Sequence, residues 1–250
     1  MKSNKELMLE RFHKVKDLGF VKSNRKNNTG VGKTFEDYVG VVENNLEEPD
    51  FAGYEIKSHR DYSQSYITLF TKSPSFPKKA NAILKDMYGI PYEEHPDLNK
   101  LFSSMFASRF TESNIYSSSF RLINDKINQQ ILIGVYDQQT KRLIDKSVGY
   151  TYAAIQKKLR NKLKNLFYVK ADTQVKDGSE YFHFNSAEIY SDPSLERFLK
   201  LLDEGKIMYD IRLGSYASGE KRGKAHDHGS GFRILEPNLT LLYNTKEDVK

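Results

Sequence analysis

The stretch Pro49–Lys57 (PDFAGYEIK) constrains this chain more than any other, because it brings charged groups to one end of a strand. Successive side chains of an extended strand point to opposite faces, so Glu55 and Lys57 share one face and the isoleucine between them points into a core. Gly53 permits a tight turn just before this strand, and the turn folds Asp50 back beside Glu55. The sequence therefore predicts a hairpin end where two carboxylates and an ammonium converge.

This convergence favours a bound cation. Two carboxylates at close range repel each other unless a cation lies between them, and hard oxygen ligands with open water positions suit Mg²⁺. A lysine beside such a site can orient or deprotonate a metal-bound water and stabilise the charge that grows on a phosphate. The pattern is typical of a metal-dependent phosphodiesterase. An Asp followed by Glu-x-Lys also occurs by chance on surface strands, where it forms cross-strand charge pairs.

The composition bounds the class of protein. The 250 residues allow one large domain or two modest ones, and 39 Lys and Arg against 33 Asp and Glu give a net charge of +6, which suits a polyanionic partner. The chain has no cysteine, which excludes disulfides and thiolate metal sites. We find neither a signal peptide nor an apolar run long enough to span a bilayer, so we expect a soluble, cytoplasmic protein without a membrane partner.

Hydrophobic periodicity predicts a mixed α/β fold. Helices are expected at residues 3–19, 34–46, 80–87, 152–163 and 193–202. Strands are expected at 66–70, 120–123, 131–136, 142–144, 166–169, 181–190, 207–213 and 232–234, besides the one that carries Glu55. Residues 89–118 have weak periodicity and predict an insertion or mobile loop, with one helical turn near 101–106. Without repeats or a clear linker, we expect a catalytic lobe and a second lobe, both built from discontinuous segments.

Three further acidic or basic features could contribute to metal or phosphate binding. Glu36 lies at the edge of the buried stripe of the second helix, a stripe that includes Val42 and Leu46, so it either supplies a third carboxylate or is a solvated glutamate. The loop 22–33 is basic and contains glycine, and it can cradle a phosphate although it lacks the glycine spacing of a P-loop. The helix at 152–163 has a basic side that faces either DNA phosphates or solvent.

A second unusual group is His226-Asp227-His228 in the Gly/Lys loop 214–231. A His-x-His pair can bind a transition metal, but the same groups can contact base edges, with Asp accepting from cytosine and His donating to guanine. Arg212 and Arg233 on the flanking strands have the fork geometry that matches guanine O6 and N7. The other histidines are scattered along the chain and provide no clear third ligand, so base readout is preferred to a metal site.

With both groups identified, the chain resembles the MvaI/BcnI family of type II restriction endonucleases, and MvaI more than BcnI. The likeness covers nearly the whole chain and is weakest from about residue 88 to 119. Its matched blocks are TGVGKTFE at 29–36, PDF at 49–51 with EIK at 55–57, TLFTKSP at 68–74, DIRLG at 210–214, and GKAHDHG at 223–229 continuing to FRI at 232–234. Several blocks in the right order are far more specific than a single Glu-x-Lys.

The resemblance implies a PD-(D/E)xK nuclease core, related in fold to the mismatch-repair nickase MutH. A catalytic lobe would then lie mainly in residues 1–90 plus parts of the middle, and a DNA-recognition lobe mainly in 120–250. Asp50 and Glu55 would be ligands of Mg²⁺, for which Mn²⁺ can substitute. Lys57 would be the catalytic lysine and Glu36 the supporting carboxylate.

The resemblance also implies how DNA is bound. The segment from Asp210 to Arg233 would read the major groove while the catalytic lobe approaches from the other side. The expected DNA-binding residues are Lys33, Lys72, Asp210, Arg212, Lys224, His226, Asp227, His228 and Arg233. Family members bind as monomers to short GC-flanked sites with one ambiguous central pair, CCWGG-like or CCSGG-like. The divergent middle segment leaves that central pair undecided.

The leading hypothesis is a Mg²⁺-dependent, sequence-specific endonuclease of a type II restriction system, which acts on double-stranded DNA as a monomer and nicks each strand in turn. It needs no obligate protein partner. One alternative is a MutH-like repair nickase that partner proteins activate. Others are a DNA-binding module without catalysis, against which the intact Asp50, Glu55 and Lys57 argue, and a His-x-His metalloprotein that acts on something other than DNA.

Overall fold

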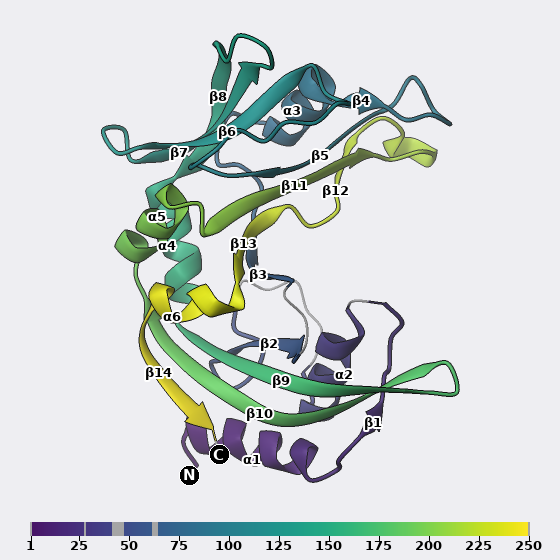
Figure 1. Cartoon of the computed structure of the whole chain (residues 1–250), viewed down its shortest axis with the longest axis vertical. Helices are drawn as coiled ribbons and strands as arrows, with labels where there is room; N and C mark the ends of the chain where they lie inside the picture. Colours follow the sequence, from purple (N-terminus) through teal and green to yellow (C-terminus); the bar gives the residue numbers. More distant parts are fainter. Residues whose placement is uncertain (1, 28, 42–47, 62–64, 250) are drawn as a thin grey trace. The chain divides into compact units, whose positions relative to one another are not determined.

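The computed structural model describes residues 2–27, 29–41, 48–61 and 65–249 (Figure 1). Contacts divide the chain into two compact units, each made of several segments. Unit 1 comprises Met1–Ser65, Lys158–Ser194 and Leu239–Lys250, and unit 2 comprises Tyr66–Lys157 and Leu195–Asn238. The chain leaves unit 1 after Ser65 and returns to it twice.

Unit 1 is built on a sheet whose strand order is β1 (Val21–Lys22), β10 (Ser179–Pro193), β9 (Asn165–Lys176) and β2 (Glu55–Arg60). The strand β14 (Tyr243–Val249) also pairs with β10. The edge strand β2 runs parallel to β9, while the other pairs are antiparallel. Parallel neighbours need a long crossover connection, and here all of the first segment of unit 2 lies between β2 and β9 in the sequence.

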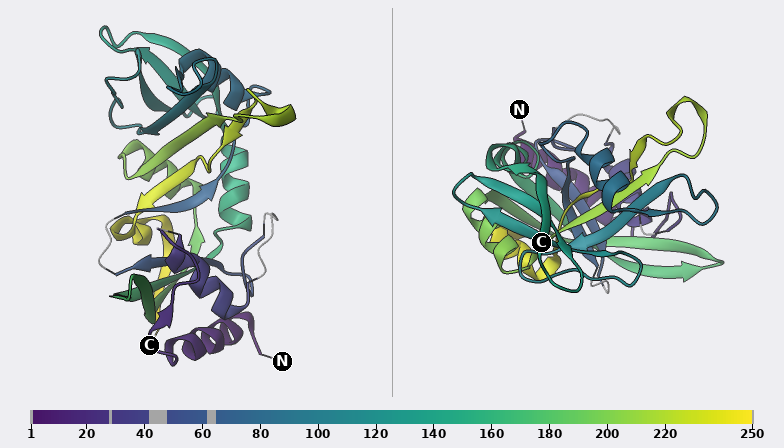
Figure 2. Two further views of the ribbon diagram at one scale, coloured as in Figure 1. Left: turned by 90° about the vertical axis from the view of Figure 1, so that its right-hand side faces the viewer. Right: turned by 90° about the horizontal axis from the view of Figure 1, so that it is seen from above.

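Two helices, α1 (Asn4–Lys16) and α2 (Gly30–Val39), cover one face of this sheet (Figures 1 and 2). Their buried side chains join alternate residues of the strands in one core, which includes Met8, Phe12, Val15, Phe35, Val39, Ile56, Phe167, Val169, Phe182 and Phe184. The strand residues between these point to the opposite face, and that face carries Glu55 and Lys57.

Helix α1 begins with the capping box that the sequence predicts. The Ser3 side chain accepts a hydrogen bond from the Glu6 N–H, and the Glu6 carboxylate accepts one from the Ser3 N–H. Helix α2 begins at Gly30, four residues before the expected start, and ends at Val39, with Gly40 as its left-handed C-cap. The predicted stripe members Val42 and Leu46 lie outside the described residues.

Gly30 explains the early start of α2. A Cβ at this position would lie 2.4 Å from the Arg25 carbonyl oxygen and 2.7 Å from Ser23 Oγ. Only glycine therefore lets the loop that precedes α2 fold against the first turn of the helix. The Asn24 N–H donates to Thr34 Oγ1 at 2.9 Å and holds the loop in this place.

Unit 2 contains two sheets. The larger has the order β3 (Tyr66–Thr71), β13 (Gly231–Leu235), β11 (Ile207–Ser215), β5 (Asn99–Met105) and β4 (Ile90–Pro91), with β12 (Ala225–Asp227) also paired to β11. The smaller is a meander of β6 (Ser118–Asp125), β7 (Gln130–Asp137) and β8 (Leu143–Thr151). The helices of this part of the chain are α3 (Ala80–Tyr88), α5 (Leu195–Asp203) and α4 (Tyr152–Asn161), which continues into unit 1.

An aromatic cluster closes the core of unit 2 around Phe232. Its ring packs against Phe70, Tyr150, Phe198 and Tyr209 with centroid separations of 5.1–5.4 Å. All five side chains are buried. Tilted and edge-on pairs of this kind stabilise beyond the burial of their area.

The segment 89–118 was predicted wrongly. It contains β4 and β5 in place of a mobile loop with a helical turn, and β5 is paired with β11 from Leu101 to Met105. Leu101 and Met105 are buried while Phe102 between them is exposed, so side chains alternate in part. The serines at 103 and 104 weaken this alternation in the sequence, and pairing with a distant strand decides the conformation.

Most other elements lie where the periodicity predicts them, and the mixed α/β class is confirmed. The expected loop 214–231 also contains a 3₁₀ turn at Gly219–Lys221 and the short strand β12. The sequence analysis missed the 3₁₀ turn Glu236–Asn238, α6 (Leu239–Leu242) and β14. Of the helices in the described ranges, none is long and apolar enough to cross a membrane.

The two glycines of α2 give a test of the packing at Gly30. Gly30→Ala is expected to lower the free energy of unfolding by about 1–3 kcal/mol, because the new methyl overlaps backbone that cannot move freely. Gly32→Ala is the matched control, since nothing lies within 4 Å of its Cβ, and it should raise stability by up to about 1 kcal/mol. Urea unfolding of both variants measures the difference, and equal effects would contradict this account of the turn.

Candidate active site

A two-residue turn forms the first part of the site. Phe51 and Tyr54 exchange backbone hydrogen bonds of 3.1 and 2.8 Å, with Ala52 and Gly53 between them at φ of 48° and 77°. Both central residues lie in the left-handed region, as in the turns that match the twist of a hairpin. The turn brings Asp50 back to β2, where its Oδ2 accepts a hydrogen bond of 2.8 Å from the Ile56 N–H.

Glu55 and Lys57 lie on one face of β2, as the alternation predicts. The Lys57 ammonium donates a hydrogen bond to Glu55 Oε1, while Ile56 is buried in the opposite core. The Glu55 side chain is fully buried, whereas that of Lys57 remains 27% exposed. The Lys57 side chain therefore contacts the buried Glu55 carboxylate and is itself partly exposed to solvent.

The second oxygen of Glu55 faces another ammonium. Lys162, directly after α4, places its Nζ 3.4 Å from Glu55 Oε2. This oxygen is buried, and it accepts no hydrogen bond from the residues that the structure describes. The carboxylate thus lies between two ammonium groups with one oxygen still able to accept a further ligand.

Burial and mutual repulsion shift the titration of these groups. Burial raises the pKa of Glu55, and the negative charge of Asp50 adds to the effect, although Lys57 and Lys162 oppose it. Burial also raises the pKa of Glu36, again with a contribution from Asp50. Burial acts to lower the pKa of Lys57, but the attraction of Glu55, Asp50 and Glu36 outweighs it and raises that pKa. Glu36 is therefore electrostatically coupled to the other three groups.

The donor set suits a small hard cation. Mg²⁺ binds through one or two carboxylates and completes its shell with water and substrate oxygens. Asp50 and Glu55 offer carboxylate oxygens at one end of β2. The buried Glu55 Oε2 accepts no hydrogen bond from the described residues, so it can bind a cation. Among the described residues, no three His, Cys, Asp or Glu side chains form a ready metal cage. This site therefore does not resemble the sites in which protein side chains alone enclose zinc or calcium.

A separate charged group lies on the larger sheet of unit 2. Asp210 is 6% exposed, and its Oδ2 meets Arg212 Nε at 2.6 Å and Arg233 Nε at 3.0 Å. Its other oxygen accepts a hydrogen bond of 3.1 Å from Ser104 Oγ. The Arg212 side chain is 47% exposed while that of Arg233 is 15% exposed. One buried carboxylate thus orients two guanidinium groups, of which Arg212 is the more accessible.

The two histidines belong to a row of rings on the β11–β12 hairpin, residues 207–227, and on His228 directly after it. The rings of Tyr216 and His226 stack at 4.4 Å, and that of His228 follows at 4.2 Å from His226. His228 is exposed, and its ring lies 6.0 Å from that of Phe102 on β5. Tyr216, His226, His228 and Phe102 are thus linked by successive ring contacts.

Asp227 has its carboxylate engaged within the protein. Its Oδ1 accepts hydrogen bonds from the N–H groups of Gly229 and Ser230 at 3.0 and 2.7 Å. Its Oδ2 accepts one of 3.2 Å from Asn81 Nδ2. These contacts shape the loop that carries His228, so Asp227 orients its neighbours, as Asp210 does.

The three lysines expected to bind DNA have different surroundings. Lys33 forms an ion pair of 3.0 Å with Asp37 one turn along α2. Lys72 is half-buried at the end of β3, and its carbonyl accepts a hydrogen bond from the Tyr150 hydroxyl. Lys224 is exposed just before β12. Lys224 is thus the one of the three best placed to meet a phosphate from solvent.

Lys162 is the residue that sequence reasoning missed at the first group. It was counted only as part of the basic side of the expected helix 152–163. A signal was present, because Lys162 follows the buried Leu159 by three positions and Ile155 by seven, which places it at the edge of the buried stripe. The identity of its partner could not be read from local spacing.

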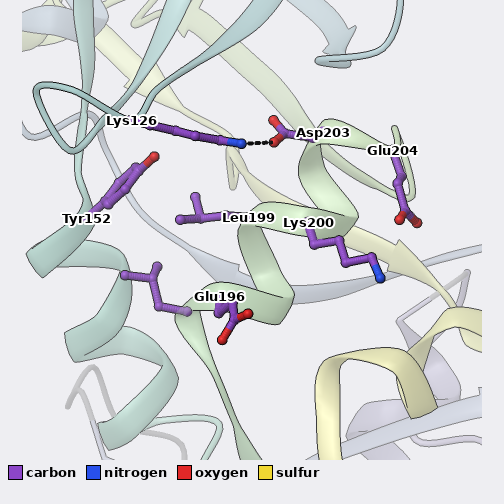
Figure 3. A pocket seen from close by; sticks show the side chains of 8 residues that line it. Lys126, Tyr152, Glu196, Leu199, Lys200, Asp203 and Glu204 are labelled. Carbon is purple, nitrogen blue, oxygen red and sulfur yellow. Dashed lines mark ion pairs between the residues drawn. The ribbon is translucent and has the colours of Figure 1, made fainter.

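A cavity of about 640 Å³ lies in unit 2 (Figure 3). Residues of α5, the β6–β7 turn and the start of α4 line it, with Leu199, Tyr152 and the ion pair of Lys126 and Asp203 among them. It contains none of the predicted site residues. The proposed catalytic and DNA-binding sites are therefore identified from the charged groups and not from this cavity.

Comparison with known proteins places the chain among nucleases. A family model described as the MvaI/BcnI restriction endonuclease family matches residues 9–243. The structure is similar to that of restriction endonuclease MvaI in complex with its cognate DNA substrate, at 36% identity and a TM-score of 0.89 over 99% of each chain. It is also similar to MvaI in the absence of DNA, at 36% identity and a TM-score of 0.68 over 100% of this chain and 99% of that one. No curated protein matches.

The environment of Asp210 leads to a stability prediction. Asp210→Ala should lower the free energy of unfolding by about 3 kcal/mol, because Arg233 is left buried without its counter-charge. Asp97→Ala is the matched control, since both Asp97 and its partner Arg222 are exposed, and it should have a much smaller effect on stability. Chemical denaturation measures both, and a loss at Asp210 as small as that at Asp97 would contradict the assigned role.

Proposed function

The chain belongs to the MvaI/BcnI restriction endonuclease family and is a type II site-specific deoxyribonuclease, and on this premise we propose that Asp50, Glu55 and Lys57 form its Mg²⁺-dependent active centre. The observation that carries the proposal is the convergence of these three groups at the end of β2. They are the residues that the sequence places in the Asp and Glu-x-Lys pattern.

Each residue has a distinct task in this proposal. Asp50 and Glu55 hold the metal ion, which when bound supplies Lewis acidity towards a water and a phosphate oxygen. The Asp50 carboxylate is oriented by the Ile56 N–H, and that of Glu55 by the two ammonium groups. Lys57, partly exposed, approaches the scissile phosphate and stabilises the negative charge that develops there. Glu36 adds negative charge from α2 and favours the bound cation.

The group on the larger sheet of unit 2 is proposed to read the DNA sequence. Arg212 is half exposed and held from behind by Asp210, so its guanidinium fork can meet the two acceptors of a guanine. Arg233 shares this carboxylate, and His228 can donate to a base edge from its exposed ring. The exposed Lys224 is proposed to contact phosphate, while Lys33 and Lys72 add positive charge.

The substrate is proposed to be double-stranded DNA with a short GC-flanked site, CCWGG-like or CCSGG-like. The similar MvaI structure is a complex with cognate DNA, and the guanine-compatible arginines of this chain agree with a GC-flanked target. We propose that one protein chain acts without an obligate partner. A nickase that partner proteins must activate is the competing assignment, and incubation of purified protein alone with DNA separates the two.

The metal assignment predicts a division between binding and cleavage. Mg²⁺ or Mn²⁺ should support hydrolysis, whereas Ca²⁺ should support binding without it, because Ca²⁺ is larger and a poorer acid towards water. Asp50→Ala, Glu55→Ala and Lys57→Met should each reduce the rate of strand cleavage by at least about 100-fold. All three should retain specific binding in a gel shift with Ca²⁺.

The control for Lys57 is Lys5→Met, which removes a half-exposed lysine of unit 1 that pairs with Glu247. It should cleave at the wild-type rate. Full cleavage in EDTA would overturn the metal assignment, and wild-type rates in any of the three site variants would show that the centre is misplaced.

The readers and the phosphate contact should differ in their effects. Arg212→Ala and His228→Ala should each lower discrimination at one base pair by about 1–3 kcal/mol. Lys224→Ala should weaken binding to all sequences alike and reduce the slope of log affinity against log salt by about 1. Competition gel shifts over a salt series measure both quantities. If all variants lose only non-specific affinity, the hairpin clamps DNA without reading it.

A single centre predicts sequential cutting. The described residues contain one Asp50–Glu55–Lys57 group, so one chain hydrolyses one phosphodiester at a time, and the second strand requires rebinding or reorientation. Supercoiled plasmid with one site should pass through an open-circular intermediate. Sedimentation of the complex with DNA should give one protein chain per site. Concerted linearisation by two chains would exclude the monomer while leaving the catalytic assignment unaffected.

A further inference from the structure

Helix α3 contains a lysine that is almost completely buried. The Lys85 side chain is 3% exposed, and lysine is rarely buried unless its charge and its donors are satisfied. Its Nζ lies 2.5 Å from Asp86 Oδ1, 2.9 Å from Ser215 Oγ and 3.3 Å from the Gly223 carbonyl oxygen. An ammonium has three N–H donors, and these three acceptors account for them.

Two of these acceptors lie at the base of the loop between β11 and β12. Ser215 is the last residue of β11, and Gly223 comes two positions before β12. A backbone hydrogen bond also closes the base of this loop, where the Gly223 N–H donates to the Tyr216 carbonyl at 3.0 Å. Lys85 therefore holds both ends of the loop in the β11–β12 hairpin from one side.

The same face of α3 contacts the hairpin a second time. Asn81 lies four residues before Lys85, so the two side chains project from neighbouring turns of one helix face. Asn81 Nδ2 donates to Asp227 Oδ2 at 3.2 Å, at the end of β12. Asp227 in turn accepts from the N–H groups of Gly229 and Ser230. Helix α3 thus braces the loop base and the end of the hairpin together.

This brace extends to the proposed base readers. The His228 N–H donates to the Arg212 carbonyl at 2.9 Å, and the Arg212 N–H donates to Ser230 Oγ at 2.8 Å. A shift of the segment that follows β12 therefore moves the backbone that carries Arg212. Recognition groups must be held to within about 0.5 Å to work, which an exposed loop cannot achieve without support.

We propose that Lys85 is a positioning residue for sequence discrimination. Its ammonium fixes the β11–β12 hairpin on α3, so that Arg212 and His228 meet the base edges in one register. The proposal rests on the function assigned above to this hairpin. Because Lys85 is buried, it acts through the hairpin and contacts no DNA itself.

Lys85→Met tests this, since methionine keeps the apolar stem and removes all three donors. Binding is measured in Ca²⁺ to three duplexes: the site mapped for the wild-type enzyme, the same site with one base pair changed, and a random sequence. The ratio of affinities for the first two duplexes should fall about tenfold or more, as expected for one misplaced base contact. Affinity for the random duplex should stay within about twofold, because phosphate contacts tolerate such shifts.

Two controls separate positioning from charge and from stability. Lys206→Met removes an equal charge from unit 2, at a lysine that pairs with Glu204 in solvent. Ile133→Val lowers stability at a buried position of β7, a strand of the smaller sheet of unit 2 and not of the sheet that contains the hairpin. Both should keep the wild-type discrimination ratio. If Lys85→Met keeps it too, or if Ile133→Val loses it at the same drop in unfolding midpoint, the proposal is overturned.

A second route covers the case in which Lys85→Met does not fold. Ser215→Ala removes one acceptor of the ammonium, and Asn81→Ala removes the other contact of α3 with the hairpin. Loss of discrimination in both supports the brace, and unchanged discrimination in both overturns it. The wild-type protein separates a failure of the proposed hairpin function from a failure of the role proposed for Lys85. If it shows no preference for any duplex, the proposed function of the hairpin fails, whereas a selective wild type with equally selective variants refutes the role of Lys85 alone.

Discussion

The proposed active centre depends on one buried carboxylate held between two ammonium groups. Glu55 is fully buried on the face of β2 opposite the core of unit 1, and Lys57 and Lys162 approach its two oxygens from different parts of the chain. A carboxylate buried without such partners would take up a proton and lose its affinity for a cation. The two lysines oppose the rise in the pKa of Glu55 and orient its carboxylate, and the turn at Ala52 and Gly53 adds Asp50 to the same end of the strand.

Unit 2 uses the same physical device for a different purpose. Asp210 is a buried anion that orients the cations of Arg212 and Arg233. Lys85 is a buried cation, and its ammonium is surrounded by neutral and anionic acceptors. In each case a charge that is removed from water is tolerated because it has oppositely charged or polar partners close to it. An arginine supported in this way loses little freedom when it meets a base, which favours selectivity in the proposed recognition.

Much of the catalytic group follows from the sequence because its geometry is local. The alternation of a strand places Glu55 and Lys57 together, and the glycine turn returns Asp50 to them within six residues. The prediction failed for residues 89–118, where β5 exists because it pairs with β11. It was incomplete for Asp227, which was expected only at base edges and whose carboxylate is engaged by its own loop and by Asn81.

The sequence by itself determined the mixed α/β class, the resemblance to a restriction endonuclease family, and the set of acidic and basic residues that carry the proposed chemistry. These depend on periodicity and on neighbours a few positions apart. The tertiary structure decided that Lys162, directly after α4, pairs with Glu55, and which side chains hold Arg212 and the β11–β12 hairpin. These contacts are between residues that lie far apart in the sequence. Buried polar groups need hydrogen-bond or ion-pair partners, and only the packing of the folded chain decides which groups become partners.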